Sequence, residues 1–278
     1  MEYTEVQLTI NPDTEGNRDI IAAELSNNGF ESFMYNNKYL GAYILTDKYN
    51  VEDVNFIIEK LSFIEISFFA ETIEDQKWNT TWTDNYFKPI VFGDELLVHA
   101  SFHKDLPQTK YKIEVDPKMA FGTGNHGTTY MILEEILETN ISGKSVLDMG
   151  TGTGILAILS KMKGSTYTLA VDNDPDACIN TSENIIINNT PDIDVKEGDI
   201  NILEEEMFDI IYENIWKNTV KADLPILEKH LNPGGIIITS GFYAKEAHEV
   251  IEAGTNAGLK HISINENNEW AVVVFKKQ

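Results

Sequence analysis

The stretch "VLDMGTGTGILAI", residues 146–158, decides the fold of this chain. An apolar run typical of a buried strand passes directly into a turn with glycine at 150, 152 and 154, and an apolar helical segment follows. Glycine permits positive φ and lets a ligand approach the backbone, while the start of a helix presents N–H groups without partners inside the helix. A strand, a glycine turn and a helix in this order predict a nucleotide-like ligand at the turn.

The sequence beyond residue 142 alternates apolar strand-like runs with helical ones. The strand-like runs include "TYTLAVDND" (166–174), "FDIIYENIW" (208–216) and "GGIIITSGF" (234–242). Such alternation is typical of a parallel sheet covered by helices on both faces. Two last strand-like runs, at 259–265 and 271–277, are joined by a turn instead. The expected fold class is therefore α/β, a Rossmann-like doubly wound and mostly parallel sheet whose last strand lies antiparallel at or near the sheet edge.

The first part of the chain has a different order of elements, namely strand, helix, strand, strand, helix, strand. Its outer strand-like runs are "YTEVQLTI" (3–10) and "ISFFAETI" (66–73). This is the split βαβ order of a small ferredoxin-like α+β domain. We therefore expect this domain over residues 1–70, a connector over 71–90 and the larger domain over 91–278.

The connector carries four aromatic residues, Trp78, Trp82, Tyr86 and Phe87. These side chains either stack on a ligand or form one face of a helix that packs on a neighbouring domain. Spacings of four residues favour the helix face. We interpret the segment as a packed connector.

Polar residues end two of the predicted parallel strands. Asp172 follows the glycine turn by about twenty residues, where an acid can accept hydrogen bonds from both ribose hydroxyls. Asp174, which precedes Pro175, is the better candidate for capping the next helix. Asn214 can either present its amide oxygen to an incoming amine or serve as a helix cap. Glu213 is either a solvated residue beside the site or a contact for a basic substrate.

The glycine spacing bears on the kind of ligand. A dinucleotide fingerprint would place glycine at 155, but Ile155 stands there, so the spacing is G-x-G-x-G. This counts against nicotinamide. S-adenosylmethionine has no pyrophosphate, and its sulfonium cation suits an acidic chain.

Composition limits the partners and the compartment. Lys and Arg total 21 against 45 Asp and Glu, a net charge of −24, which disfavours direct nucleic-acid binding and either reflects solubility or attracts a basic partner. The single cysteine, Cys178, cannot form an internal disulfide, and no metal site is expected. The N-terminus lacks a secretion signal and no apolar run is long enough to span a bilayer, so we expect a cytoplasmic protein without membrane association.

Five motifs in order carry a family resemblance. They are "DPKMAFGTGNHGTT" (116–129), "VLDMGTGTGILAI", "VDNDPDA" (171–177), "NI" (214–215) and "LNPGGIIITSGF" (231–242). Together they resemble the bacterial methyltransferases that modify large-subunit ribosomal protein eleven, and the similarity spans roughly residues 78–278.

This resemblance implies a class I S-adenosylmethionine-dependent methyltransferase. Its N-terminal domain would recognise the basic ribosomal protein, and its catalytic domain would methylate lysine side chains and the N-terminal amine. Carried over motif by motif, the cofactor contacts would be Thr129, Gly150, Asp172 and Asn214, with the loop at 120–129 folding over the ligand. We further expect Asn214 to orient the neutral amine, without a dedicated side-chain base.

Two departures from the family pattern concern the substrate side. Asn125 stands where the family usually has Thr, and "WKN" follows the "NI" motif where the family has Leu and small residues. Trp216 then either lines the path of the amine or packs beneath it, and His126 is either a hydrogen-bonding strut or a base.

Three alternatives stay open at this point. The first is a methyltransferase on the same scaffold that acts on another protein or on a small-molecule amine. The others are a non-catalytic nucleotide-binding module and a nicotinamide enzyme with an unusual loop.

Overall fold

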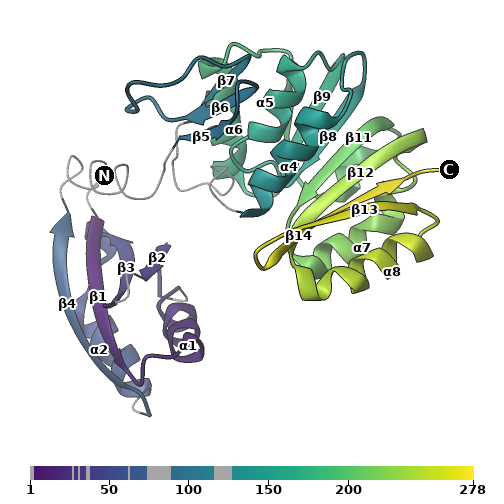
Figure 1. Ribbon diagram of the computed structural model, residues 1–278. Coiled ribbons are helices and arrows are strands. Elements are labelled where there is room, and N and C mark those ends of the chain that lie inside the picture. The colour runs from purple at the N-terminus through teal and green to yellow at the C-terminus, as the bar shows by residue number, and fades with distance from the viewer. Residues whose placement is uncertain are drawn as a thin grey trace. The chain divides into compact units, whose positions relative to one another are not determined.

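The computed structural model describes residues 3–26, 28–30, 32–35, 38–61, 63–73, 89–115 and 127–278 (Figure 1). The chain divides into two compact units, Met1–Tyr86 and Phe87–Gln278. The four connector aromatics, together with Asn125 and His126 of the first glycine loop, lie outside the described residues. Each unit is described by itself.

The first unit is a four-stranded antiparallel sheet with two helices. Its elements are β1 (Tyr3–Asn11), α1 (Glu15–Ser26), β2 (Ser32–Tyr35), β3 (Leu40–Leu45), α2 (Val51–Lys60) and β4 (Glu65–Ile73). The strand order is β2-β3-β1-β4, and every neighbouring pair is antiparallel. This is the ferredoxin-like order, so the predicted fold of the N-terminal region is confirmed.

Alternating side chains explain why this sheet has one covered face. Val6, Leu8 and Ile10 of β1 are buried against the helices, where Ile57 of α2 joins the same core. Helix α2 begins after Asn50, whose side-chain oxygen accepts a hydrogen bond from the Glu52 N–H (3.0 Å).

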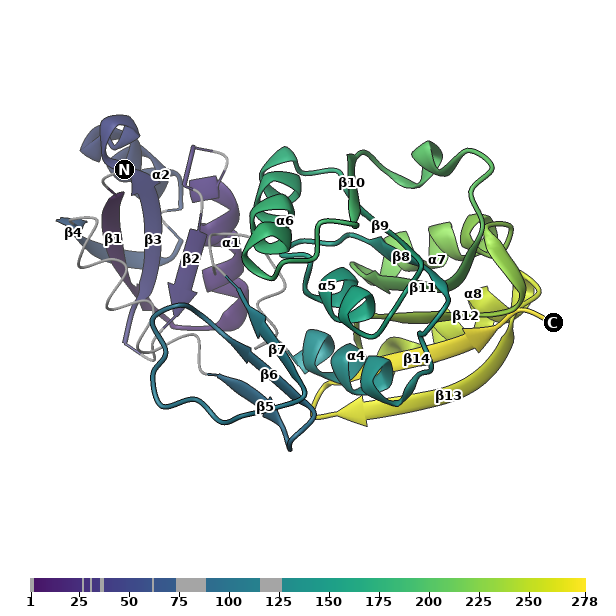
Figure 2. The ribbon, with the colours of Figure 1, turned by 90° about the horizontal axis from the view of Figure 1, so that it is seen from above.

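The second unit is built around a seven-stranded sheet (Figure 2). Its strands are β8 (Ser145–Met149), β9 (Tyr167–Asp172), β10 (Asp194–Glu197), β11 (Phe208–Asn214), β12 (Leu231–Tyr243), β13 (Lys260–Asn267) and β14 (Trp270–Lys276). The order is β10-β9-β8-β11-β12-β14-β13, in which β8 to β12 run parallel and β14 runs antiparallel to both of its neighbours. The predicted doubly wound sheet is confirmed, with β13 at the edge and β14 one strand inside it.

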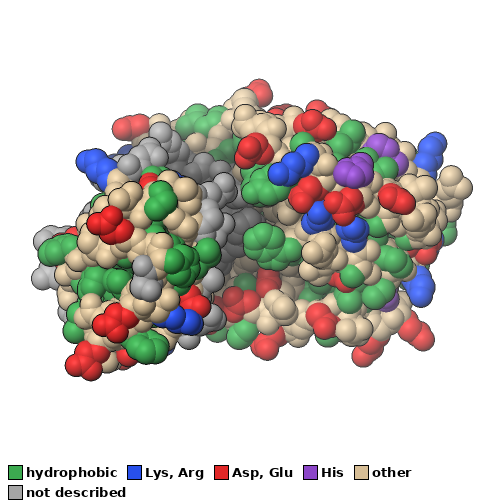
Figure 3. Space-filling model, turned by 90° about the horizontal axis from the view of Figure 1, so that it is seen from below, with side chains coloured by type: hydrophobic (Ala, Val, Ile, Leu, Met, Phe, Trp, Pro, Cys, Tyr) green, Lys and Arg blue, Asp and Glu red, His purple; other side chains and the backbone are tan. Residues whose placement is uncertain are grey.

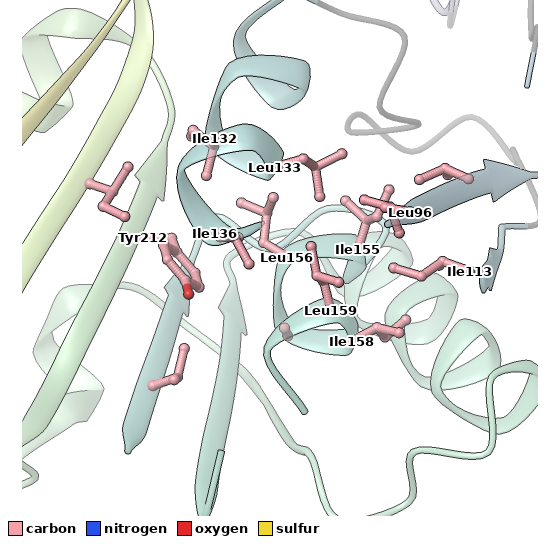
Figure 4. Close-up of a cluster of buried hydrophobic side chains, with 14 of the residues drawn as sticks. Leu96, Ile113, Ile132, Leu133, Ile136, Ile155, Leu156, Ile158, Leu159 and Tyr212 are labelled. Carbon is pink, nitrogen blue, oxygen red and sulfur yellow. The ribbon is translucent and has the colours of Figure 1, made fainter. Parts of the chain in front are cut away.

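Helices cover both faces of this sheet. They are α4 (Gly127–Glu138), α5 (Ile155–Met162), α6 (Pro175–Ile187), α7 (Lys217–Leu227) and α8 (Ala247–Asn256). Residues of α4, α5 and α6 share one apolar core, and those of α7 and α8 share the core on the opposite face. Figure 4 shows the first core, where Ile132 of α4 and Leu156 of α5 lie near Tyr212 of β11.

A small three-stranded sheet adjoins the first of these cores. It consists of β5 (Ile90–Phe92), β6 (Leu96–His99) and β7 (Tyr111–Glu114), with β5 antiparallel and β7 parallel to β6. Leu96 and Ile113 point toward the side chains of α5 (Figure 4).

Strand order fixes where a ligand can bind. The chain winds from β8 outward to β10 on one side and from β11 outward on the other, so the carboxyl ends of β8 and β11 flank a crevice that no connection crosses. Among the described residues, no helix is long and apolar enough to cross a bilayer, and no group of three or more His, Cys, Asp or Glu could hold a metal ion.

Candidate functional site

A cavity of about 440 Å³ opens at the carboxyl edge of the central sheet. A volume of this size is typical of sites for small molecules and cofactors. Gly150, Asp172 and Asn214, which follow or end three different strands, all line it. The remaining lining residues are Met149, Gly152, Asn173, Gly198, Asp199, Ile200, Ile215, Trp216, Thr219, Asp223, Gly241 and Trp270.

The glycine turn is held by the end of β8 and by the neighbouring strand β9. The Gly150 N–H donates to the Val171 carbonyl (2.8 Å). Asp148 Oδ2 accepts hydrogen bonds from the Thr151 hydroxyl (2.8 Å) and from the Ala157 N–H of α5 (3.2 Å). Burial raises the pKa of Asp148 to about 7. This carboxyl group thus ties the turn to the first turn of α5, behind the ligand face.

Asp172 faces the cavity from the end of β9. Its Oδ2 accepts the Gly152 N–H (2.9 Å) and its Oδ1 accepts the Asp174 N–H (3.0 Å), which together fix the carboxylate in place. Asp174 caps α6 by accepting the Asp176 N–H (2.9 Å), as predicted. The structure therefore separates the two acids as the sequence suggested, one at the cavity and one at a helix end.

Asn214 ends β11 with its side chain nearly buried (8% exposed). Its Nδ2 donates to Thr129 Oγ1 of α4 (3.2 Å), and its Oδ1 has no hydrogen-bond partner within the part of the chain that the structure describes. The capping alternative is excluded, because Trp216 occupies the position that precedes α7. Thr129, itself 1% exposed, is thereby joined to the cavity through Asn214.

The backbone after Asn214 is clamped by two glycines. A Cβ on Gly150 (φ +73°) would lie 2.4 Å from Ile215 Cγ2, and a Cβ on Gly241 (φ +97°) would lie 2.0 Å from the Ile215 carbonyl oxygen. Only glycine fits at either position. Sequence reasoning missed Gly241, although an isolated glycine inside a strand pattern is a signal of close backbone approach.

Trp216 lies at the cavity with its side chain 83% exposed. The alternative in which it packs beneath the site is therefore wrong. The next residue, Lys217, forms ion pairs with Glu246 (2.8 Å) and Glu249 (2.9 Å), so the start of α7 is tied to α8 and to the turn before it.

Glu213 faces away from solvent. It is 0% exposed, and neither of its carboxyl oxygens has a hydrogen-bond partner among the residues described. Burial raises the pKa of Glu213 well above its ordinary value, and the nearby Asp223 carboxyl raises it further. The interpretation of Glu213 as a solvated residue is therefore wrong.

The loop after β10 supplies further lining residues that the sequence analysis overlooked. Asp199 and Ile200 line the cavity, and the Gly198 N–H donates to the Asp172 carbonyl (2.8 Å). The signal was present in "EGDI" (197–200), a glycine and an acid directly after a strand. With Asp172, Asp199 and Asp223 at its wall and little other charge, the cavity suits a nucleoside that carries a cation.

The sheet order and the cavity beside the glycine turn define a Rossmann-like methyltransferase. Ribosomal protein L11 methylase from Lactobacillus delbrueckii subsp. bulgaricus has a similar solved structure, with a TM-score of 0.64 and 26% identity, covering 69% of this chain and 100% of that one.

The sequence comparisons identify the family. The family model for ribosomal protein L11 methyltransferase (PrmA) matches residues 7–278. The ribosomal protein L11 methyltransferases of Phocaeicola vulgatus and Bacteroides fragilis are 40% and 38% identical to this chain, and each alignment covers 99% of both sequences. The chain belongs to the ribosomal protein L11 methyltransferase family, as its motifs predicted.

Proposed function

We propose that this protein transfers methyl groups from S-adenosylmethionine to amines of ribosomal protein L11. The target amines are lysine side chains and the N-terminal amine. The family membership supports the methyltransferase activity and the substrate, and the cavity chemistry supports the donor. Because the substrate is a ribosomal protein, we place the reaction in the cytoplasm.

One observation carries the proposal, namely the unpaired amide oxygen of Asn214. A buried acceptor without a partner costs about 1–3 kcal/mol. A neutral amine that enters the cavity would donate an N–H to this oxygen. The Thr129 hydroxyl holds the other end of the amide, so the acceptor direction is set before the amine arrives.

The cofactor contacts divide into two groups in this proposal. Gly150 and Asp172 would hold the cofactor, the glycine through its exposed backbone and the acid through the ribose hydroxyls. Thr129 and Asn214 would complete the cofactor contacts, and Asn214 would also contact the amine.

Alignment is the main catalytic requirement of this reaction. When bound, the cofactor supplies a methyl group whose bond to sulfur breaks as its bond to the amine nitrogen forms. A lysine ammonium has a pKa near 10.4, so freeing its lone pair at pH 7 costs roughly 4–5 kcal/mol. Loss of hydration and the positive charge of the bound cofactor would both lower the pKa of the ammonium group, and the proton would leave to water. Asn214 Oδ1 then fixes the direction of the lone pair.

The first unit would recognise the ribosomal protein. We propose that the small domain over residues 1–70 has this role, that 71–90 connects it, and that 91–278 carries the chemistry. Acidic side chains are spread over the described surface in Figure 3, and the chain carries 45 acidic against 21 basic residues. This charge favours a basic protein as the partner.

The test is methylation of ribosomal proteins from cells that lack this modification, with mass spectrometry of every labelled protein. We expect methyl groups on lysine and N-terminal amines of L11. Label on a different protein, or only on a small amine, would support the alternative on the same scaffold.

Substitution at Asn214 tests the assignment of the site. Asn214→Ala should lower kcat about 100-fold while the Kd for S-adenosylhomocysteine changes by less than about fivefold. Asn256→Ala, at an exposed position near the end of α8, is the matched control and should leave both values unchanged. Equal losses in kcat and cofactor affinity would refute the role of Asn214 in orienting the amine.

A further inference from the structure

The exposed side chain of Trp216 is unusual for its position. Tryptophan is usually highly buried, yet this one is 83% exposed beside a functional cavity. Neither of the two core clusters formed by the described residues of the second unit includes it. Its indole ring therefore contributes little to the packing of the fold.

The backbone that carries this side chain is held on both sides. Ile215, the preceding residue, is clamped between Gly150 and Gly241. Lys217, the following residue, is held by Glu246 and Glu249. The backbone at Trp216 is thus held in place by the contacts of both neighbouring residues. This reduces the conformational entropy that is lost when a partner contacts Trp216.

Trp216 follows Asn214 by two positions along the chain, and the side chains of Trp216 and Asn214 line the same cavity. Trp270 lines it from β14 and stacks on Tyr243 with ring centroids 4.6 Å apart. An amine that reaches Asn214 therefore enters a cavity whose lining includes the Trp216 ring.

We propose that Trp216 is a specificity-determining contact for the alkylammonium group of the target side chain. The inference rests on the proposed function and adds a substrate-side residue to it. Aromatic faces attract ammonium groups through the ring quadrupole, and tryptophan does so most strongly. The aliphatic part of a lysine side chain packs on the same indole surface.

The contact gains importance as methylation proceeds. Asn214 accepts a hydrogen bond only while the nitrogen still carries an N–H. Each added methyl group removes one such hydrogen, whereas attraction to an aromatic face survives in a quaternary ammonium. Trp216 should therefore retain methylated intermediates for further transfer better than the amide can.

The experiment compares Trp216→Ala, Trp216→Phe and the control Ile186→Ala. Ile186 is also exposed (77%) but does not line the cavity. We expect Trp216→Ala to raise the KM for L11 by roughly 5- to 30-fold and to shift products toward the monomethyl form. Trp216→Phe should recover most of the loss, and Ile186→Ala should match the wild type. The Kd for S-adenosylhomocysteine should stay within about twofold in all variants.

A second readout does not depend on turnover. Binding of N-acetyl-trimethyllysine amide to the enzyme saturated with S-adenosylhomocysteine can be followed by ligand-observed NMR, and it should weaken at least fivefold in Trp216→Ala. Unchanged KM, products and probe binding would overturn the proposal, as would a loss of cofactor affinity equal to the loss for L11. If the wild-type enzyme binds the probe through Trp216 but does not methylate L11, the assignment of L11 as the substrate is contradicted, whereas the contact between Trp216 and the ammonium group is not.

Discussion

Replacing Gly241 by alanine tests whether the Ile215 clamp positions the site. The added Cβ would lie 2.0 Å from the Ile215 carbonyl oxygen and 2.7 Å from the carbonyl carbon. These are backbone atoms, so no side-chain rotation relieves the overlap. Strand β12 and the segment from Asn214 to Trp216 must separate by more than about 1 Å to reach ordinary contact at 3.4 Å.

A matched glycine separates the clash from the backbone cost. Gly258 has φ +93°, close to the +97° of Gly241, and a Cβ on it would meet nothing within 4 Å. Gly258→Ala should therefore cost only the roughly 1–2 kcal/mol of a left-handed alanine. Gly241→Ala adds overpacking of about 1–3 kcal/mol, for a total of roughly 2–5 kcal/mol. Gly150→Ala should fall between the two, because its clash is with the Cγ2 of a side chain that can rotate.

Urea unfolding gives the free energies, and initial methylation rates give the functional effect. A displacement of about 1 Å near the reacting groups can lower the rate about 100-fold. We expect Gly241→Ala to show such a loss and Gly258→Ala to retain the wild-type rate. If the two variants unfold within about 0.5 kcal/mol of each other and have equal rates, Ile215 is not clamped as described.

Three other perturbations probe the cofactor side, pH and charge. Asp172→Ala should weaken the binding of S-adenosylmethionine, measured by calorimetry, about 10- to 100-fold, because it removes the acceptor proposed for the ribose hydroxyls. An unchanged Kd would show that Asp172 does not belong to the cofactor site. The pKa of Asp148 is raised from 3.8 to about 7 in the folded protein, so the folded state retains a proton that the unfolded chain releases. The stability that this proton contributes is fully present below about pH 4 and is lost as the pH rises through 7. The free energy of unfolding of Asp148→Asn, relative to that of the wild type, should therefore rise by roughly 3–4 kcal/mol between pH 4 and pH 8. If urea unfolding gives the same difference between variant and wild type at every pH, the raised pKa is contradicted. Added salt should raise the KM for L11 and leave the Kd for S-adenosylhomocysteine unchanged, whereas a salt-independent KM would exclude charge steering.

The architecture of both units could be predicted because hydrophobic periodicity reports it directly. Unbroken apolar runs marked the parallel strands, and the order of elements marked the ferredoxin-like sheet. The inner position of β14 was also encoded. Its residues 271–275 are all buried, whereas β13 has only partly buried and exposed positions, which is typical of an edge strand.

The candidate site could be predicted only in part. Asp172 and Asn214 were accessible because parallel strands gather their carboxyl ends at one edge. The close approach of Gly241 to Ile215 was not, because it depends on how β12 lies beside the end of β11, where Asn214 pairs with Ser240. The hydrogen bond from Asn214 to Thr129 likewise joins residues 85 positions apart, a contact that no local pattern encodes.

The end of β11 also bears on the balance between stability and function. Glu213 and Asn214 follow five mostly buried residues, and both leave buried oxygens unpaired within the described part of the chain. The raised pKa of Glu213 favours its uncharged form, which costs less to bury than a carboxylate. The amide of Asn214 has no such option, so its oxygen costs about 1–3 kcal/mol until a donor arrives.

Asn214→Leu, a replacement of similar volume, should therefore unfold at a urea concentration equal to or above that of the wild type, while methylation is lost. The variant also loses the hydrogen bond to Thr129, worth about 0.5–1.5 kcal/mol. A destabilisation of more than about 2 kcal/mol would therefore show that the oxygen is already satisfied in the resting protein and that the amide is a structural group.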